Sequence, residues 1–151
     1  MTINPVFTNA KPDLTVGYQL NDVTTVTADA LDLVKEVRNI SQGVTDFGAI
    51  NQARPGETLE YRIRFSNNAV APVRNLVVND ATPAYTSFVS ASSGSRPATL
   101  TACAKRTPAS TDAVDCSAVQ TQQGKGVVSW MFDGPLDPGA TGEVLYRVTV
   151  D

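Results

Sequence analysis

The sequence predicts an all-β protein with the architecture of a β-sandwich, because apolar and polar residues alternate over several separate runs. Two of these runs follow a Pro-Gly turn, one at Pro55 and the other at Pro138. No window keeps a helical period of 3.6 residues, and the best helical candidate, 28–37, is rich in β-branched and acidic residues. Strands half buried between two sheets explain this pattern best.

The clearest strand is predicted at residues 58–67. Its alternate positions carry Glu60, Arg62 and Arg64, so one face of the strand belongs to the core and the other faces solvent. Further strands are predicted at 73–80, 86–92, 126–132 and 141–150. The large side chains on their apolar faces are expected to pack together between two sheets: Tyr61, Ile63, Phe65, Phe88, Trp130 and Tyr146.

Length and composition fit one domain of this kind. The chain has 151 residues, of which 42% are hydrophobic, enough for a single core. A net charge of −3 argues against nucleic acid as a partner, because phosphate binding needs a basic surface. No apolar stretch approaches the roughly 20 residues of a membrane span, and the N-terminus shows no signal-peptide pattern.

The two cysteines lie in the least strand-like segment, 93–125, which is rich in Ser, Thr, Ala and Pro. A long excursion inside a small domain is usually functional or fixed in place. We predict a disulfide between Cys103 and Cys116, and therefore an extracellular or cell-surface protein. The alternative is a pair of free thiols in the same loop.

The chain has no histidine, which excludes Ser-His-Asp and Cys-His catalysis and histidine-bound metals. Two aspartate pairs remain, Asp112 with Asp115 and Asp133 with Asp137. Aspartates beside Gly and Pro are usually turn formers, so we expect no catalytic, cofactor or metal site. A calcium site at Asp112 and Asp115 is a weaker alternative.

A glycosylation sequon stands at Asn39-Ile40-Ser41. Such a tripeptide occurs by chance in most chains of this size. The sequence alone therefore assigns it no use.

Six ordered blocks resemble the bacterial and archaeal surface-protein repeat known as domain of unknown function 11, and together they span residues 31–150. The blocks are LVKEV at 33–37, PGETLEYRIRFSN at 55–67, LVVNDATP at 76–83, FVSAS at 88–92, VSW at 128–130 and LDPGAT at 136–141. The resemblance implies an immunoglobulin-like sandwich, usually in tandem in secreted, wall-attached or filamentous proteins, where it serves as a stalk or adhesive spacer. Here one copy is present, and the 93–125 excursion is longer than the repeat usually has.

The resemblance also divides the chain into an N-terminal extension, 1–30, and a sandwich, 31–151. In the tandem repeats a final strand follows the run that corresponds to 146–150, whereas a matching strand here lies at 21–27, three residues before Leu31. In an immunoglobulin-like sheet the final strand can lie parallel to the first one. A connection between parallel neighbours needs a dozen or more residues, and only three separate this strand from Leu31. We therefore predict that residues 14–28 form a strand donated to a neighbouring subunit, with these side chains filling its open edge: Val16, Tyr18, Leu20, Val23 and Val26. The alternative is a leader that is disordered, or folded back antiparallel on its own subunit, as a fragment of a tandem array would also show.

Surface sandwiches of this general kind sometimes carry a lysine–asparagine isopeptide bond. Lys35 lies in the first expected strand of the sandwich, and Asn79 and Asp80 are candidate partners. The side-chain period favours an ordinary surface lysine instead, if Val34 and Val37 share the core with a bulge between them. The isopeptide therefore stays a weaker hypothesis at this point.

The leading functional hypothesis is a structural subunit of an extracellular filament or surface assembly. Such a subunit would polymerise head to tail with copies of itself through the donated strand. The alternatives are a monomeric adhesive module whose 93–125 loop binds a glycan or protein, and one repeat of a larger surface protein.

Overall fold

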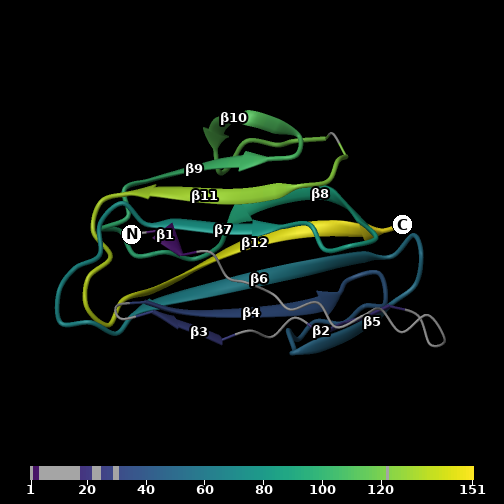
Figure 1. The fold of residues 1–151 in the computed structure, drawn as a ribbon, viewed down its shortest axis with the longest axis horizontal. Coiled ribbons are helices and arrows are strands. Elements are labelled where there is room, and N and C mark those ends of the chain that lie inside the picture. Colours follow the sequence, from purple (N-terminus) through teal and green to yellow (C-terminus); the bar gives the residue numbers. More distant parts are fainter. Residues whose placement is uncertain (1, 4–17, 22–24, 29–30, 122) are drawn as a thin grey trace.

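The structure is a computed structural model that describes residues 2–3, 18–21, 25–28, 31–121 and 123–151. In this part of the chain all regular structure is strand, and two sheets pack face to face as a β-sandwich (Figure 1). The strands are β1 (Thr2–Ile3), β2 (Tyr18–Asn21), β3 (Thr25–Ala28), β4 (Leu31–Asn39), β5 (Ile50–Ala53), β6 (Thr58–Asn67), β7 (Val77–Ala81), β8 (Thr86–Ser93), β9 (Ala102–Thr107), β10 (Ser110–Asp115), β11 (Val127–Asp133) and β12 (Thr141–Val150). The all-β prediction is confirmed.

One sheet has the strand order β3-β4-β6-β12-β8 and the other has the order β1-β7-β11-β9-β10, while β2 and β5 form a small separate pair. Within the described residues every pairing is antiparallel except that of β1 with β7, which is parallel. Both Pro-Gly turns carry a glycine in the left-handed region, Gly56 with φ 86° before β6 and Gly139 with φ 77° before β12. Glycine is the residue that adopts this conformation without strain.

The core lies between the two sheets, where the sequence predicted it. All six side chains predicted for the core are buried: Tyr61, Ile63, Phe65, Phe88, Trp130 and Tyr146. Tyr61 and Tyr146 stand opposite each other on β6 and β12 with ring centroids 5.0 Å apart. Trp130 reaches them from the other sheet, 6.0 Å from the ring of Tyr146. These contacts join the two sheets through aromatic packing.

Close packing also fixes one glycine in β12. Gly142 stands opposite Phe65 in the register of β6 and β12. A Cβ atom at Gly142 would lie 2.5 Å from Cζ of Phe65, which is far inside contact distance. A larger residue there would displace the phenylalanine from the core.

The N-terminal segment pairs with its own chain in the parts that the structure describes. β3 runs antiparallel to β4, with Val26 opposite Leu33, and β2 runs antiparallel to β5, with Tyr18 opposite Ala53 and Leu20 opposite Asn51. Val16 and Val23 lie outside the described residues. The antiparallel pairing of β3 with β4 matches the alternative of a leader folded back on its own subunit. Donation of this segment to a neighbour therefore stays a prediction.

The 93–125 excursion is more regular than the sequence suggested. It contains the hairpin of β9 and β10, and β9 lies inside the sheet between β11 and β10. Cys103 and Cys116 form the predicted disulfide, with their Cα atoms 5.4 Å apart. Lys105 is buried beside it, and its ammonium donates to the carbonyls of Ala91, Cys116 and Ala118. The excursion is thus part of the sandwich.

Titration of the denatured, non-reduced protein with a thiol reagent is expected to find no free thiol, because both cysteines of the chain are bonded. Reduction is expected to lower the free energy of unfolding by about 3 kcal/mol, the chain-entropy value for a short loop. Urea unfolding with and without reductant measures this difference. Two titratable thiols would contradict the disulfide and the extracellular assignment that rests on it.

Candidate functional site

The most unusual group in the core is the side chain of Lys35. The inward positions of β4 are Leu31, Leu33, Lys35, Val37 and Asn39, in strict alternation. The side chain of Lys35 is 2% exposed, so the expectation of a surface lysine is wrong. The error came from placing Val34 in the core with a bulge before Val37. The strand has no bulge against β6, and Lys35 stands opposite Ile63 in an unbroken register.

Lys35 meets Asp80 across the sandwich. Its Nζ lies 3.0 Å from Oδ2 of Asp80 in β7, and the side chain of Asp80 is also 2% exposed. The hydroxyl of Tyr146 donates to the same Oδ2 over 2.9 Å, and the backbone N–H of Ala81 donates to Oδ1 over 2.8 Å. The ammonium lies 4.6 Å from the centroid of the Tyr61 ring. These groups form a buried cluster that connects the two sheets.

Burial raises the pKa of Asp80 above its usual range, although the charge of Lys35 and the hydrogen bonds from Lys35, Ala81 and Tyr146 act in the opposite direction. The cause is desolvation, which penalises a carboxylate in an apolar interior more than its partners stabilise it. The carboxyl of Asp80 is therefore easier to protonate than an ordinary aspartate.

The other candidate partner of Lys35 faces away from the cluster. Asn79 alternates with Val78 and Asp80 along β7, and it is half buried on the opposite face, opposite Ser129 of β11. Of the two candidates named from the sequence, the structure brings Asp80 to Lys35 and leaves Asn79 apart. Tyr61 and Tyr146 were predicted as core residues, and their place beside a charged pair could not be predicted from their apolar alternation alone.

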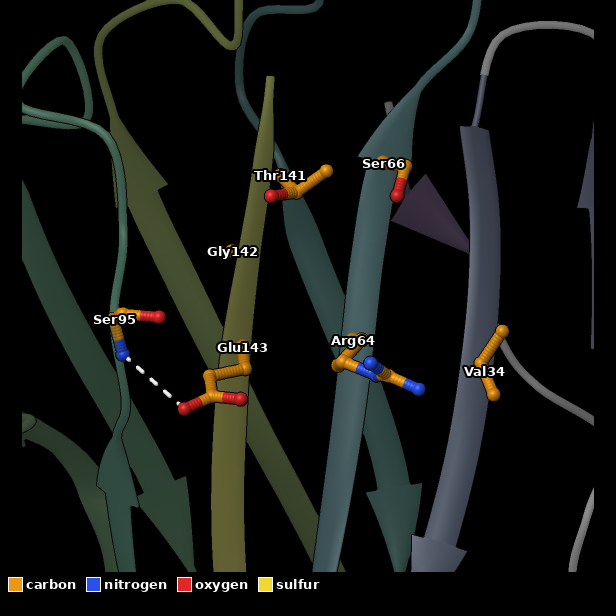
Figure 2. A pocket seen from close by; sticks show the side chains of 7 residues that line it. All are labelled: Val34, Arg64, Ser66, Ser95, Thr141, Gly142 and Glu143. Carbon is orange, nitrogen blue, oxygen red and sulfur yellow. Dashed lines mark hydrogen bonds between the residues drawn. The ribbon is translucent and has the colours of Figure 1, made fainter. Parts of the chain in front are cut away.

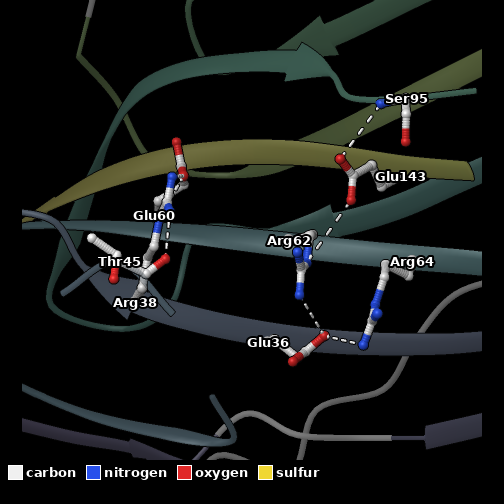
Figure 3. Close-up of polar contacts among 8 residues, drawn as sticks. All are labelled: Glu36, Arg38, Thr45, Glu60, Arg62, Arg64, Ser95 and Glu143. Atoms are coloured by element: carbon white, nitrogen blue, oxygen red, sulfur yellow. Dashed lines mark hydrogen bonds and ion pairs between the residues drawn. The ribbon is translucent and has the colours of Figure 1, made fainter. Parts of the chain in front are cut away.

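The outer face of the β4-β6-β12 sheet carries paired charges. Glu60 accepts a hydrogen bond from Arg38 on β4, and Glu36 forms ion pairs with Arg62 and Arg64 (Figure 3). Glu60 also accepts a hydrogen bond from Arg147 on β12. These pairs run across neighbouring strands and satisfy one another. The side chain of Glu60 is only 6% exposed between its two arginines, whereas Glu36 and its arginines are more exposed to solvent. Solvent-exposed pairs typically contribute below about 1 kcal/mol each.

The same face has a shallow hollow of about 210 Å³ beside this charged region. Figure 2 shows that it is open and crosses β4, β6 and β12, with Arg64 and Glu143 pointing across it. Its lining residues are Val34, Arg64, Ser66, Ser95, Thr141, Gly142 and Glu143. The hollow has no buried wall and no convergent set of reactive groups. It resembles a solvated sheet surface more than a ligand pocket.

The asparagine of the sequon has a structural task. Asn39 is fully buried, and its amide donates to the carbonyl of Gln52 and to Oε2 of Glu57. Glu57 also accepts from the backbone N–H of Arg54. Both amide hydrogens of Asn39 are thus engaged, which leaves no accessible nitrogen for a glycan in the folded protein.

The hydrogen bonds at Glu57 predict a pH dependence. The bond from the Arg54 N–H, with the one from Asn39, lowers the pKa of Glu57 below its usual range. Stability from this carboxylate is therefore present above its unfolded pKa of about 4.3, and it is lost as the pH falls through the lower folded value. Between about pH 6 and about pH 3, the free energy of unfolding measured in urea should decline less for Glu57→Gln than for the parent protein. Equal slopes would contradict the assignment.

The two aspartate pairs from the sequence show no shared site. Asp115 accepts hydrogen bonds from the N–H and hydroxyl of Ser117, which is the turn-forming role expected for it. In the part of the chain that the structure describes, no group of three or more acidic or cysteine side chains could hold a metal ion. That same part contains no helix long and apolar enough to cross a membrane.

Comparison of the chain with models of known protein families found no match, and comparison with curated protein sequences found none either. The interpretation of the chain therefore rests on its own residues and geometry.

Proposed function

We propose that this chain is a structural module of an extracellular or cell-surface assembly, and that it carries mechanical load between its neighbours. The observation that carries the proposal is the direction of two strands. β4 and β12 both pair antiparallel with β6, so they run the same way in one sheet. The chain enters β4 at Leu31 beside Asn67 and leaves β12 beside Thr58, at the opposite end of the sandwich (Figure 1).

Entry and exit at opposite ends suit a module that is joined end to end with its neighbours. The ten residues of β12 extend over about 33 Å at the usual rise per residue. Tension between the two ends acts along the strands, so the ladders β4-β6 and β6-β12 are loaded in shear and their hydrogen bonds must break together. The disulfide and the buried cluster at Lys35 add further links within the unit.

Copies of the module could join by exchange of β3, and we include this in the proposal. β3 is an edge strand that pairs with β4 over four residues, from Ala28 opposite Leu31 to Thr25 opposite Val34. In a single chain it covers its own β4. The same ladder made with β4 of the next copy would bury the same edge and link the copies head to tail.

Single-molecule pulling tests the load-bearing role. Handles at residue 31 and at the C-terminus should give a high rupture force, because they load the ladders in shear. Handles at Ser66 and Thr141, which are register partners at one end of β6 and β12, should give a much lower force because they unzip the ladder bond by bond. Equal rupture forces for the two attachments would contradict a module built to bear load along its strands.

A further inference from the structure

Among the described residues, the amine of Lys35 and the carboxyl of Asp80 are two groups that can react with each other. They meet in a site from which their surroundings exclude water: Nζ and Oδ2 are 3.0 Å apart, and both side chains are 2% exposed. We propose that Lys35 and Asp80 condense into an intramolecular amide, which links β4 in one sheet covalently to β7 in the other. The proposal does not depend on the mechanical role, because it concerns a bond within one folded chain.

The geometry places the reactants for attack. Nζ lies 3.0 Å from Oδ2, which is bonded to the carboxyl carbon that the amine would attack, and holding reactants together in a fixed orientation lowers the barrier to such a step. β4 fixes Lys35 through its register with β6, and β7 fixes Asp80 through its pairing with Val128 of β11. Tyr61 and Tyr146 stack on each other beside the pair, 5.0 Å between ring centroids, and close the site with aromatic surface.

The two oxygens of Asp80 have different partners, and these suit different tasks. Oδ1 accepts the backbone N–H of Ala81, a fixed donor for the oxygen that becomes negative when nitrogen attacks the carboxyl carbon. Oδ2 contacts both Lys35 and the hydroxyl of Tyr146, so it is the oxygen positioned to collect protons and leave. Tyr146 is therefore the proposed proton carrier, and its hydroxyl touches a reacting atom.

The step balances without an oxidant, a reductant or a further reactant. The ammonium of Lys35 gives up two of its three protons, and both arrive on Oδ2, one of them through Tyr146. A bond forms between Nζ and the carboxyl carbon, and the bond from that carbon to Oδ2 breaks. One water molecule leaves, and the amide keeps the third proton. The raised pKa of Asp80 favours the protonated carboxyl that this departure requires.

Lys105 provides an internal comparison. It is as deeply buried as Lys35, but its Nζ donates to three backbone carbonyls, those of Ala91, Cys116 and Ala118. Backbone amides do not condense with an amine, so Lys105 is expected to stay unmodified. Burial alone therefore does not single out Lys35, whereas its contact with a carboxyl does.

Mass spectrometry of the intact, reduced and denatured protein tests the proposal. The parent chain is expected to weigh about 18 Da less than its sequence, the mass of one water. Peptide mapping should place the loss on a branched peptide that joins the Lys35 and Asp80 segments. A parent chain that has folded, as its circular dichroism would show, and that has the full unmodified mass would overturn the proposal.

Two variants separate chemistry from packing. Lys35→Arg keeps the positive charge but lacks the primary amine, so it should fold and show the full mass. Tyr146→Phe keeps the stacked ring but removes the proton carrier. When each chain is synthesised in a cell-free system and folds for the first time, the loss of about 18 Da should therefore appear at least roughly tenfold more slowly in Tyr146→Phe than in the parent. An unchanged rate would remove Tyr146 from the mechanism, and a mass loss in Lys35→Arg would assign the modification elsewhere.

Discussion

Trp130→Ala is expected to lower the free energy of unfolding by about 3–5 kcal/mol, the range for deleting a large aromatic side chain from a packed core. Trp130 is fully buried in β11, lies 6.0 Å from the ring of Tyr146, and donates its indole N–H to the carbonyl of Ser92 over 3.2 Å. The substitution removes both the packing between the sheets and a hydrogen bond. Chemical unfolding followed by circular dichroism measures the loss.

Val127→Ala on the same strand is the matched control, because Val127 is 62% exposed and should change stability by less than about 0.5 kcal/mol. Fluorescence gives a second readout, since Trp130 is the one tryptophan of the chain. Its emission should be blue-shifted in the folded protein and protected from a soluble quencher. A red-shifted, quenchable tryptophan would mean that the side chain of Trp130 faces solvent and not the core.

Asp80→Ala is expected to cost a similar amount, about 3–5 kcal/mol, because it leaves the amine of Lys35 in the core without the carboxyl it contacts. It also removes an acceptor of the Tyr146 hydroxyl. The double variant Lys35→Met, Asp80→Leu replaces both groups with apolar ones and should be more stable than Asp80→Ala alone. Unfolding curves of the parent and the two variants give this comparison.

A double variant that is less stable than Asp80→Ala would show that the two side chains act independently. In that case the cluster would have no joint role, and the covalent link would lose its structural basis as well.

The strands that could be predicted from the sequence are those whose inward positions are apolar. β12 follows this rule along its whole length and β6 from Leu59 to Phe65, so their faces and their aromatic residues were predicted correctly. β9 was missed for a physical reason. Its inward positions are Cys103, Lys105 and Thr107, and the alternation is present but two of the three side chains are polar. Hydrogen bonds in the folded protein, which a sequence does not display, make those positions tolerable.

The same limit explains the candidate site. Lys35 continues the alternation of Leu31, Leu33 and Val37, but a lysine is normally assigned to solvent, so the pattern was interpreted with a bulge. Only the position of Asp80 in the opposite sheet shows why the lysine can be buried. A charged residue that keeps the inward phase of a strand is the signal that could have identified the site.

Sedimentation of the purified chain over a concentration series, with negative-stain microscopy of the same samples, tests the proposed assembly most directly. The full chain should form head-to-tail oligomers that lengthen with concentration. Removal of residues 1–28 should abolish them, and the truncated chain should bind a peptide of residues 14–28 added separately. Val119→Ser, at a residue 90% exposed in the segment between β10 and β11, should assemble like the parent. A full chain that stays monomeric at every concentration, and is no more stable than the truncated one, would contradict the account.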